Sequence, residues 1–272
     1  MSEQTIGLAA PAPAAHKPQA RRHGGALLPR LICGAVLLGL WELVVRTMAP
    51  AYVAKPTTVA LAIPHVIVDP KFLTAVGNTL IAVAEGLAIA LALGTVIGLM
   101  MGRSATLERV IRHYVNGFYA MPMIVVLPLF SLWFGYSGTA RLATVIFAAI
   151  FSIIMNVADG ARSVPKDFLE VAASFRSSPA RTLYEIVLPA ATPYLLAGFR
   201  LAAGRALIGA VVAEFFLSIG GIGYFILFNS RTYHHNEAFV GVLLLAGFGV
   251  GFELLVVWAT RRFLPWYRRD EK

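Results

Sequence analysis

Six long apolar runs constrain this chain more than any other feature of its sequence. A helix needs about 20 largely apolar residues to cross the hydrocarbon core of a bilayer, and every backbone polar group must find its partner within the segment. The runs lie near residues 31–48, 76–101, 118–135, 140–157, 193–217 and 238–259. Since only 14% of the residues are charged and 58% are hydrophobic, a soluble globular domain is excluded. The sequence therefore predicts an all-α integral membrane protein with six spans.

The segments outside these runs define the rest of the organisation. Residues 1–30 are rich in Ala and Pro and lack an apolar period, so we expect a disordered tail. The first apolar run is too long for a signal peptide and has no small-residue exit, which favours an uncleaved first span. The third and fourth spans are separated only by "GYSGTA" and should form a tight hairpin. The transmembrane domain is expected over 31–265, followed by a basic tail over 266–272.

The distribution of basic residues predicts the orientation of the spans. If both termini are cytoplasmic, 16 Lys and Arg residues lie inside and 5 lie outside. Basic residues accumulate in cytoplasmic loops, so both termini are expected inside a bacterial inner (cytoplasmic) membrane. The net charge of +9 is explained by this bias, and no nucleic-acid partner is expected.

The second span carries small residues at every fourth position. Positions four apart share one face of a helix, and small side chains let a second helix approach closely. This ridge suits either packing within the bundle or a seam with another subunit. Its members are Ala82, Gly86, Ala90, Gly94, Gly98 and Gly102.

The loop between the fourth and fifth spans, residues 158–190, is too long for a simple connection. Pro165 and Asp167 suit the start of a first helix. Its apolar face would hold Phe168, Val171, Ala172 and Phe175 at helical spacing. Ser178 with Pro179 then suits the N-terminus of a second helix, which we expect to end at Pro189.

Pattern alone leaves two readings of this cytoplasmic hairpin. It is either an amphipathic pair of helices lying on the bilayer surface or a docking element for a cytoplasmic partner. Small Ala residues beside Glu170 form a low surface that fits a groove. A membrane-surface helix more often shows larger anchors with flanking Lys and Arg.

The same segment resembles the EAA loop of inner-membrane permease subunits of binding-protein-dependent ABC importers. That pattern is Glu-Ala-Ala, three residues, Gly, nine residues, then Ile-x-Leu-Pro. Arg176 occupies the Gly slot, where it costs about 1 kcal/mol if the backbone keeps a positive φ. Either the turn has another shape, or Arg176 contacts the partner itself. The resemblance implies an ATPase-coupling surface made of Glu170, Val171, Ala172, Ala173, Arg176, Ser177, Ser178, Pro179, Ile186, Leu188 and Pro189.

Further stretches resemble the sulfonate/nitrate/taurine branch of these permeases. They are "LPLFSLWFGYSGTAR", "DGARSVPKDFLEVAASF" and "GFRLAAGRALIGAVVAEFFLSIGGIGYFI". The resemblance implies a translocation subunit, a homodimer in the lipid bilayer, served by ABC ATPase subunits and an extracytoplasmic solute-binding protein. Sulfonates, taurine, nitrate and small heterocyclic vitamin precursors are all compatible solutes. The chain has no phosphate-binding loop of its own, so ATP hydrolysis would belong to a partner.

Charged and special residues inside the spans are candidates for the translocation pathway. Charges in a membrane are costly and usually face protein or water. Pathway candidates are Arg200, Arg205, Glu214, Glu85, Pro122 and Pro128. The arginines suit an anion path, or else ion pairs that hold helices together, and the prolines should kink the third span. Gly220, Gly221 and Gly223 predict a short re-entrant or surface helix near an outer gate. No cofactor or metal site is expected, and adjacent His234 and His235 do not make one.

Two other functions remain open on the sequence. A proton-coupled secondary transporter would use the carboxylates of Glu42, Glu85, Glu214 and Glu253 as a relay. A membrane scaffold without transport would leave the charges inside the spans without a purpose. Uptake driven by ATP, rather than by a proton gradient, distinguishes the permease from the first rival. Co-purification of an ATPase distinguishes it from the second.

Overall fold

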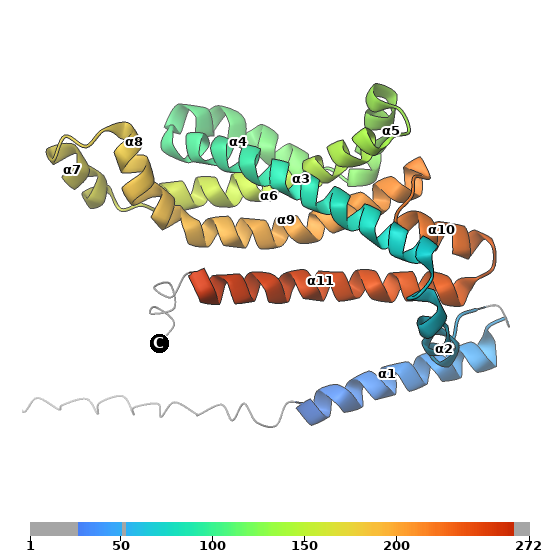
Figure 1. Cartoon of the computed structure of the whole chain (residues 1–272). Coiled ribbons are helices and arrows are strands. Elements are labelled where there is room, and N and C mark those ends of the chain that lie inside the picture. Colours follow the sequence, from blue (N-terminus) through green and yellow to red (C-terminus); the bar gives the residue numbers. More distant parts are fainter. Residues whose placement is uncertain (1–26, 51–52, 264–272) are drawn as a thin grey trace, which may run out of the picture.

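The computed structural model describes residues 27–50 and 53–263, and every regular element in these ranges is a helix, as expected (Figure 1). Residues 264–272 and most of the 1–30 tail lie outside the described residues, although α1 already begins at Leu27. In chain order the helices are α1 (Leu27–Met48), α2 (Pro56–Val66), α3 (Pro70–Arg103), α4 (Ala105–Ala120), α5 (Met123–Phe134), α6 (Gly138–Arg162), α7 (Lys166–Ser174), α8 (Pro179–Thr182), the π-helical turn η1 (Leu183–Val187), α9 (Leu188–Leu217), α10 (Ile222–Arg231) and α11 (His235–Phe263).

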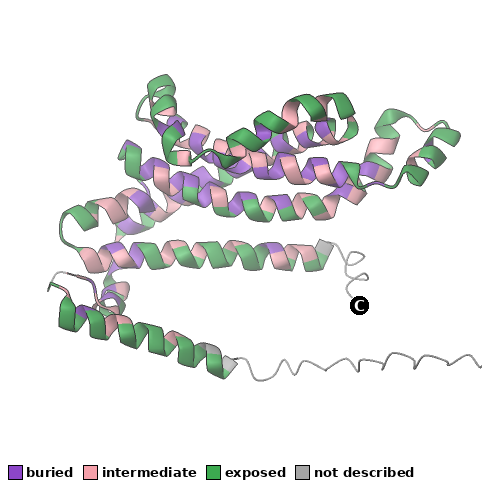
Figure 2. Ribbon diagram, turned by 180° about the vertical axis from the view of Figure 1, so that it is seen from behind, coloured by how far each residue is buried: buried purple, intermediate pink, exposed green. Residues whose placement is uncertain are grey.

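The core lies between α3, α6 and α9, which run side by side through the middle of the molecule (Figures 1 and 2). The small-residue ridge of α3 faces α6. A Cβ atom added to Gly86 would lie 2.5 Å from Cγ1 of Val145, and one added to Gly102 would lie 2.5 Å from the carbonyl oxygen of Ala158. The ridge therefore serves packing within the bundle, and the alternative of a subunit seam at this face is wrong.

The predicted third span, 118–135, is not one straight helix. Met121 and Pro122 separate α4 from α5, and the two helices meet at an angle of 99°. A residue before proline is pushed out of the helical region, and Met121 accordingly has φ −69° and ψ 129°. The 12 residues of α5 reach only about 18 Å, which is too short to cross a bilayer alone. Pro128, by contrast, lies inside α5.

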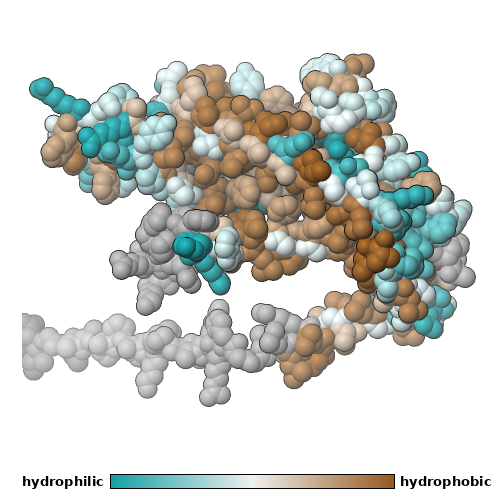
Figure 3. Space-filling model, viewed as in Figure 1, coloured by the Kyte–Doolittle hydropathy of each residue, from teal (hydrophilic) through white to brown (hydrophobic). Residues whose placement is uncertain are grey.

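The remaining spans agree with the sequence-based prediction. Within the described ranges, five helices are long and apolar enough to cross a membrane, and α4 with α5 makes a sixth candidate if the bent pair counts as one span. The turn between α5 and α6 is as tight as expected, with Gly135 at φ +70°. Figure 3 shows an apolar middle between two more hydrophilic ends, one around α7 and α8 and the other around α2 and α10.

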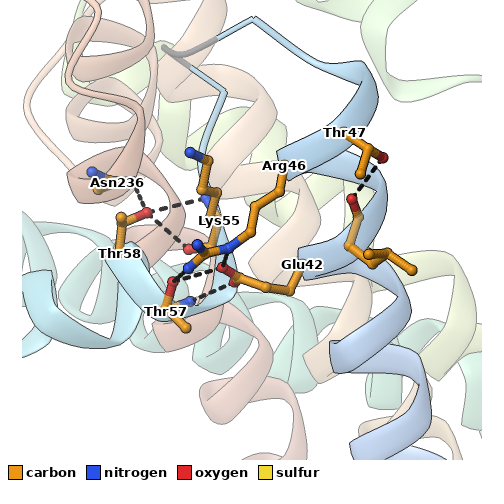
Figure 4. A network of polar contacts seen from close by, with 8 residues as sticks. Glu42, Arg46, Thr47, Lys55, Thr57, Thr58 and Asn236 are labelled. Carbon is orange, nitrogen blue, oxygen red and sulfur yellow. Dashed lines mark hydrogen bonds and ion pairs between the residues drawn. The ribbon is translucent and has the colours of Figure 1, made fainter.

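A polar network ties α1 to the rest of the chain (Figure 4). The Glu42 carboxylate accepts hydrogen bonds from the backbone N–H of Thr57 at 3.0 Å and from its hydroxyl at 2.9 Å. It also pairs with Arg46 at 2.5 Å. Because Thr57 lies in the first turn of α2, this carboxylate satisfies a free N–H at a helix N-terminus. The next residue, Thr58, donates a hydrogen bond to the Asn236 side chain of α11 at 2.9 Å.

Candidate functional site

The segment from Lys166 to Val187 forms a helical hairpin that projects from one end of the bundle (Figure 1). Asp167 lies in the first turn of α7, as expected, while Pro165 is the N-cap and not part of the helix. The hydroxyl of Ser178 accepts the backbone N–H of Arg181 and caps α8, whose first residue is Pro179. The two helices and their connecting turn are therefore placed as the sequence predicts.

Arg176 keeps the backbone that a glycine would adopt in its slot. Its φ is 52°, in the left-handed region. Its N–H donates to the carbonyl of Ala173 at 2.9 Å, and the N–H of Ser177 donates to the carbonyl of Ala172 at 2.9 Å. This pair of bonds defines a Schellman motif, in which the residue after the helix is left-handed. Of the two alternatives, the differently shaped turn is therefore wrong, and the arginine side chain is left exposed.

The second helix of the hairpin does not end at Pro189, contrary to expectation. Residues Pro179–Leu217 form one continuous helical segment of 39 residues. The π-helical turn Leu183–Val187 lies just before the proline, and the N–H of Leu188 donates to the carbonyl of Leu183. A wider turn makes room for a proline ring that would otherwise clash with the carbonyl four residues earlier. The hairpin is thus continuous with the fifth span.

The apolar face of α7 is divided between the interior and the surface. Ala172 is buried, and Leu169 packs against Val164 and Val187. Phe168 and Phe175 are 59% and 84% exposed, and Val171 is 55% exposed. The sequence predicts one continuous apolar face on α7. In the structure, the two aromatic rings of that face are exposed, next to the exposed Glu170.

The other predicted coupling residues lie between the hairpin and the bundle or at its surface. Ala173, Ser177 and Pro179 line an apolar cavity of about 490 Å³ between the hairpin and the end of α3. Ile186 and Leu188 are half-buried, and Pro189 is exposed.

Four charged residues behind the hairpin form an ion-pair network that the sequence did not suggest. Arg112 lies 3.0 Å from Glu108 and 2.9 Å from Asp159, and Arg162 contacts both acids. The network joins α4 to the last turn of α6, directly before α7 begins. The alternation of charges four apart on α4 was a usable signal, but its partners on α6 lie about 50 residues away in the sequence.

At the opposite end of the bundle, the carboxylate of Glu214 is completely buried. It accepts hydrogen bonds from the hydroxyl of Thr79 at 2.8 Å and from the backbone N–H of Gly223 at 2.8 Å. Arg141 lies 3.2 Å away and also donates to the carbonyl of Gly220 at 2.9 Å. The structure thus joins one pathway candidate with the gate glycines. Sequence reasoning did not name Thr79 or Arg141 as members of this site.

The short helix expected after the fifth span is α10, and its glycines are explained by close contacts. A Cβ atom on Gly221 would overlap the Glu214 carboxylate. One on Gly223 would lie 2.7 Å from the carbonyl oxygen of Val211. Ser218 takes a left-handed conformation, φ 53°, and turns the chain from α9 back toward α10. These close contacts hold the start of α10 against α9.

Most of the other charged residues inside the spans have interaction partners. Arg200 on α9 pairs with Glu253 on α11. The Arg205 guanidinium lies 3.8 Å from the ring centroid of Tyr119 and donates to its carbonyl oxygen, so it stabilises the C-terminal end of α4 at the bend. Glu85 differs, because it is exposed on α3 and makes no ion pair or hydrogen bond with a described residue. Among the described residues, no group of three His, Cys, Asp or Glu is placed to hold a metal ion.

Comparisons with known proteins agree with this architecture. The family described as binding-protein-dependent transport system inner membrane component matches residues 90–269. The putative aliphatic sulfonates transport permease protein SsuC of Bacillus subtilis (strain 168) is 28% identical over 255 residues, covering 92% of this chain and 91% of its own.

A second relative and a solved structure extend the comparison. The formylaminopyrimidine transport permease protein ThiX of Halalkalibacterium halodurans is 26% identical, covering 86% of this chain and 94% of its own. The crystal structure of a bacterial ABC transporter for the import of the acidic polysaccharide alginate has the same fold. It aligns with a TM-score of 0.64 at 13% identity, covering 88% of this chain and 94% of that one.

Proposed function

The chain belongs to the family of inner-membrane components of binding-protein-dependent transport systems, and from this premise we propose how it is driven and what it carries. As a permease subunit of an ABC importer it forms a translocation pathway through the membrane. The energy comes from ATP hydrolysed by a separate chain, which docks on the hairpin Lys166–Val187.

The observation that carries this proposal is the combination of an exposed tip and a rigid stem. Phe168, Val171 and Phe175 are all exposed apolar side chains, and the exposed Glu170 lies beside them in the sequence. Exposed apolar patches bordered by polar groups are typical of docking surfaces. The hairpin continues into α9 without a break, so a displacement of the tip moves the whole helix. Movement of two such hairpins by an ATPase pair would open and close the pathway alternately.

The distribution of basic residues supports a membrane orientation with the hairpin on the cytoplasmic side. With the hairpin and both termini in the cytoplasm, α2 and α10 lie at the extracytoplasmic end. A solute-binding protein would deliver its cargo there, against the segment that holds Gly220, Gly221 and Gly223. Glu214, Thr79 and Arg141 would hold that segment in place as positioning residues.

A second copy of the chain completes the pathway in this proposal. Glu85 is exposed halfway along an apolar span, where a bare carboxylate facing lipid would be unfavourable. A second subunit or a water-filled path between two subunits removes that cost. A homodimer fits, because two copies of the same chain then supply both walls of the pathway.

The solute is a small anion, such as a sulfonate, taurine or nitrate. SsuC is named for aliphatic sulfonates, which supports this class. ThiX is named for formylaminopyrimidine, so a small heterocycle is the alternative.

The central test is Glu170→Lys in the chain co-expressed with its ATPase. Glu170 is exposed and has no ion pair with a described residue, so the substitution should leave membrane insertion unchanged. We expect co-purification of the ATPase and ATP-dependent uptake to be lost. Arg109→Glu, a charge reversal on the exposed face of α4 outside the hairpin, is the control and should retain both.

Two outcomes would overturn the proposal. Full uptake by Glu170→Lys would show that the hairpin does not couple the ATPase. Uptake that persists without ATP and collapses with the proton gradient would instead favour the secondary transporter.

A further inference from the structure

A pocket of about 300 Å³ lies between the first half of α3 and the start of α10. Its polar wall is formed by Lys71, Thr74, Asn78 and Tyr224, and its apolar wall by Phe225 and Phe228. The backbone of Gly220 and Gly221 forms the remaining side. The volume is at the lower end of the range for small-molecule sites.

The wall contains hydrogen-bond donors that no described residue uses. Asn78 is half-buried, and a Cβ atom on Gly220 would lie 3.4 Å from its amide nitrogen, which places that nitrogen beside the pocket. Neither its amide nor the Tyr224 hydroxyl forms a hydrogen bond with a described residue. The Lys71 ammonium has no ion pair in the described part of the chain. The Thr74 hydroxyl is already occupied, because it donates to the carbonyl of Pro70 at 2.8 Å.

The electrostatics of the pocket are positive. No Asp or Glu of the described ranges belongs to its wall. Glu214 lies behind the glycines, but Arg141 at 3.2 Å balances its charge. Asp69 lies two residues before Lys71 and is not part of the wall. Its carboxylate accepts a hydrogen bond from the Lys71 backbone N–H at 2.9 Å. The ammonium of Lys71 is therefore the uncompensated charge of this site.

We propose that this pocket binds a small organic anion at the outer end of the pathway. The negative group lies among Lys71, Asn78 and Tyr224, and a short apolar part packs against Phe225 and Phe228. The inference rests on the proposed function, because it names the class of solute and the place where it first meets the permease.

The wall chemistry discriminates within the anions. An inorganic anion such as nitrate leaves the two phenylalanine rings without a partner. Taurine carries an ammonium group that finds no carboxylate on the wall, so its affinity should be lower than that of ethanesulfonate. The pocket therefore favours an alkanesulfonate or a similar short organic anion over a zwitterion.

Binding is measured directly by saturation-transfer difference NMR on the full permease–ATPase complex in nanodiscs, with ethanesulfonate as the probe. The wild-type complex should saturate the methyl protons of the probe. Lys71→Met and Asn78→Leu should each weaken binding about tenfold, the size expected for loss of a hydrogen bond to a charged group. Lys71→Arg should retain most of the binding. Arg231→Gln removes a positive charge from the end of α10 outside the pocket and should have no effect.

The outcomes separate this inference from the proposed function. Three results would each overturn the proposed binding site: no saturation transfer in the wild type, binding of taurine equal to that of ethanesulfonate, or unchanged binding in Lys71→Met. Binding that follows the pattern above, in a complex that performs no ATP-dependent uptake, would overturn the proposed function and leave the pocket standing.

Discussion

At the residue scale, Arg176 shows how a family pattern is kept in backbone conformation while the residue type changes. The turn between α7 and α8 has a left-handed residue and both hydrogen bonds of a Schellman motif, although the residue is not Gly. A side chain with a Cβ atom costs about 1–2 kcal/mol in this conformation. The turn persists because Ser178 caps the next helix and Ala172 anchors the last turn of α7.

Replacing Arg176 with Gly should stabilise this turn. The relief of the left-handed strain is partly offset by the greater freedom of Gly in the unfolded chain. The net stabilisation should be about 0.5–1 kcal/mol. Hydrogen exchange of the Arg176 and Ser177 amides should slow by about two- to fivefold. Arg176→Ala is the control, since it removes the long side chain but keeps the Cβ atom, and it should not slow exchange. Equal slowing in both variants would mean that the side chain, not the backbone, carries the effect.

At the scale of elements, the contact between α3 and α6 sets the spacing of the core. Gly98 lies so close to α6 that an added Cβ atom would be 2.8 Å from Cβ of Val157 and 2.9 Å from the carbonyl oxygen of Ile154. Neither neighbour is the end of a flexible side chain. The two helices would have to separate, and the buried cluster that they share with α9 would loosen.

Gly98→Ala should therefore destabilise the protein by about 1–3 kcal/mol, the usual cost of overpacking a core. The measurement is the midpoint of thermal unfolding of the purified complex in detergent, which should fall. Gly117→Ala on α4 is the matched control, because nothing lies within 4 Å of the added Cβ atom. A helical Ala is favoured over Gly, so the control should unfold at the same or a higher temperature. A fall of the same size in both variants would contradict the tight seam.

Apolar length and small-residue spacing predicted five of the six spans and the α3 ridge, because these signals are local and repeat along the chain. The bend at Met121–Pro122 was underestimated, since proline signals a break but not its angle. The π-helical turn before Pro189 lets the helix continue where local rules predict an end. Helix α2 was missed, although Pro56 and the apolar spacing of Val59, Ala62 and Val66 indicate one.

The partners of Glu214 could not be predicted from local sequence patterns, because they come from distant parts of the chain. The members of this polar site come from α3, α6, α9 and the start of α10, and Thr79 is 135 residues from Glu214 in the sequence. A buried carboxylate needs partners, so a functional or structural role could be predicted, but the identity of the partners depends on packing.

For the whole molecule, the arrangement of polar ends around an apolar middle determines which surfaces meet water. The hairpin and the ion-pair network of Arg112 and Arg162 with Glu108 and Asp159 lie at one end, and α10 with its pocket lies at the other (Figures 1 and 3). The long helices α3, α6 and α9 connect these ends directly. A force applied to the hairpin therefore reaches Glu214 through α9 without crossing a flexible loop.

This arrangement predicts opposite accessibility for two engineered cysteines in intact cells. Cys33 is exposed on α1 and is first replaced by Ser, so that each variant has one thiol. Phe175→Cys at the hairpin tip should react with a membrane-impermeant maleimide only after the cells are opened. Ser230→Cys near the end of α10 is exposed and should react in intact cells. The Cys33→Ser parent controls for background labelling, and recovery of each variant in the membrane fraction shows that the protein is inserted. Labelling of Phe175→Cys in intact cells would show that the orientation is inverted. It would then contradict the assignment of the hairpin to a cytoplasmic ATPase.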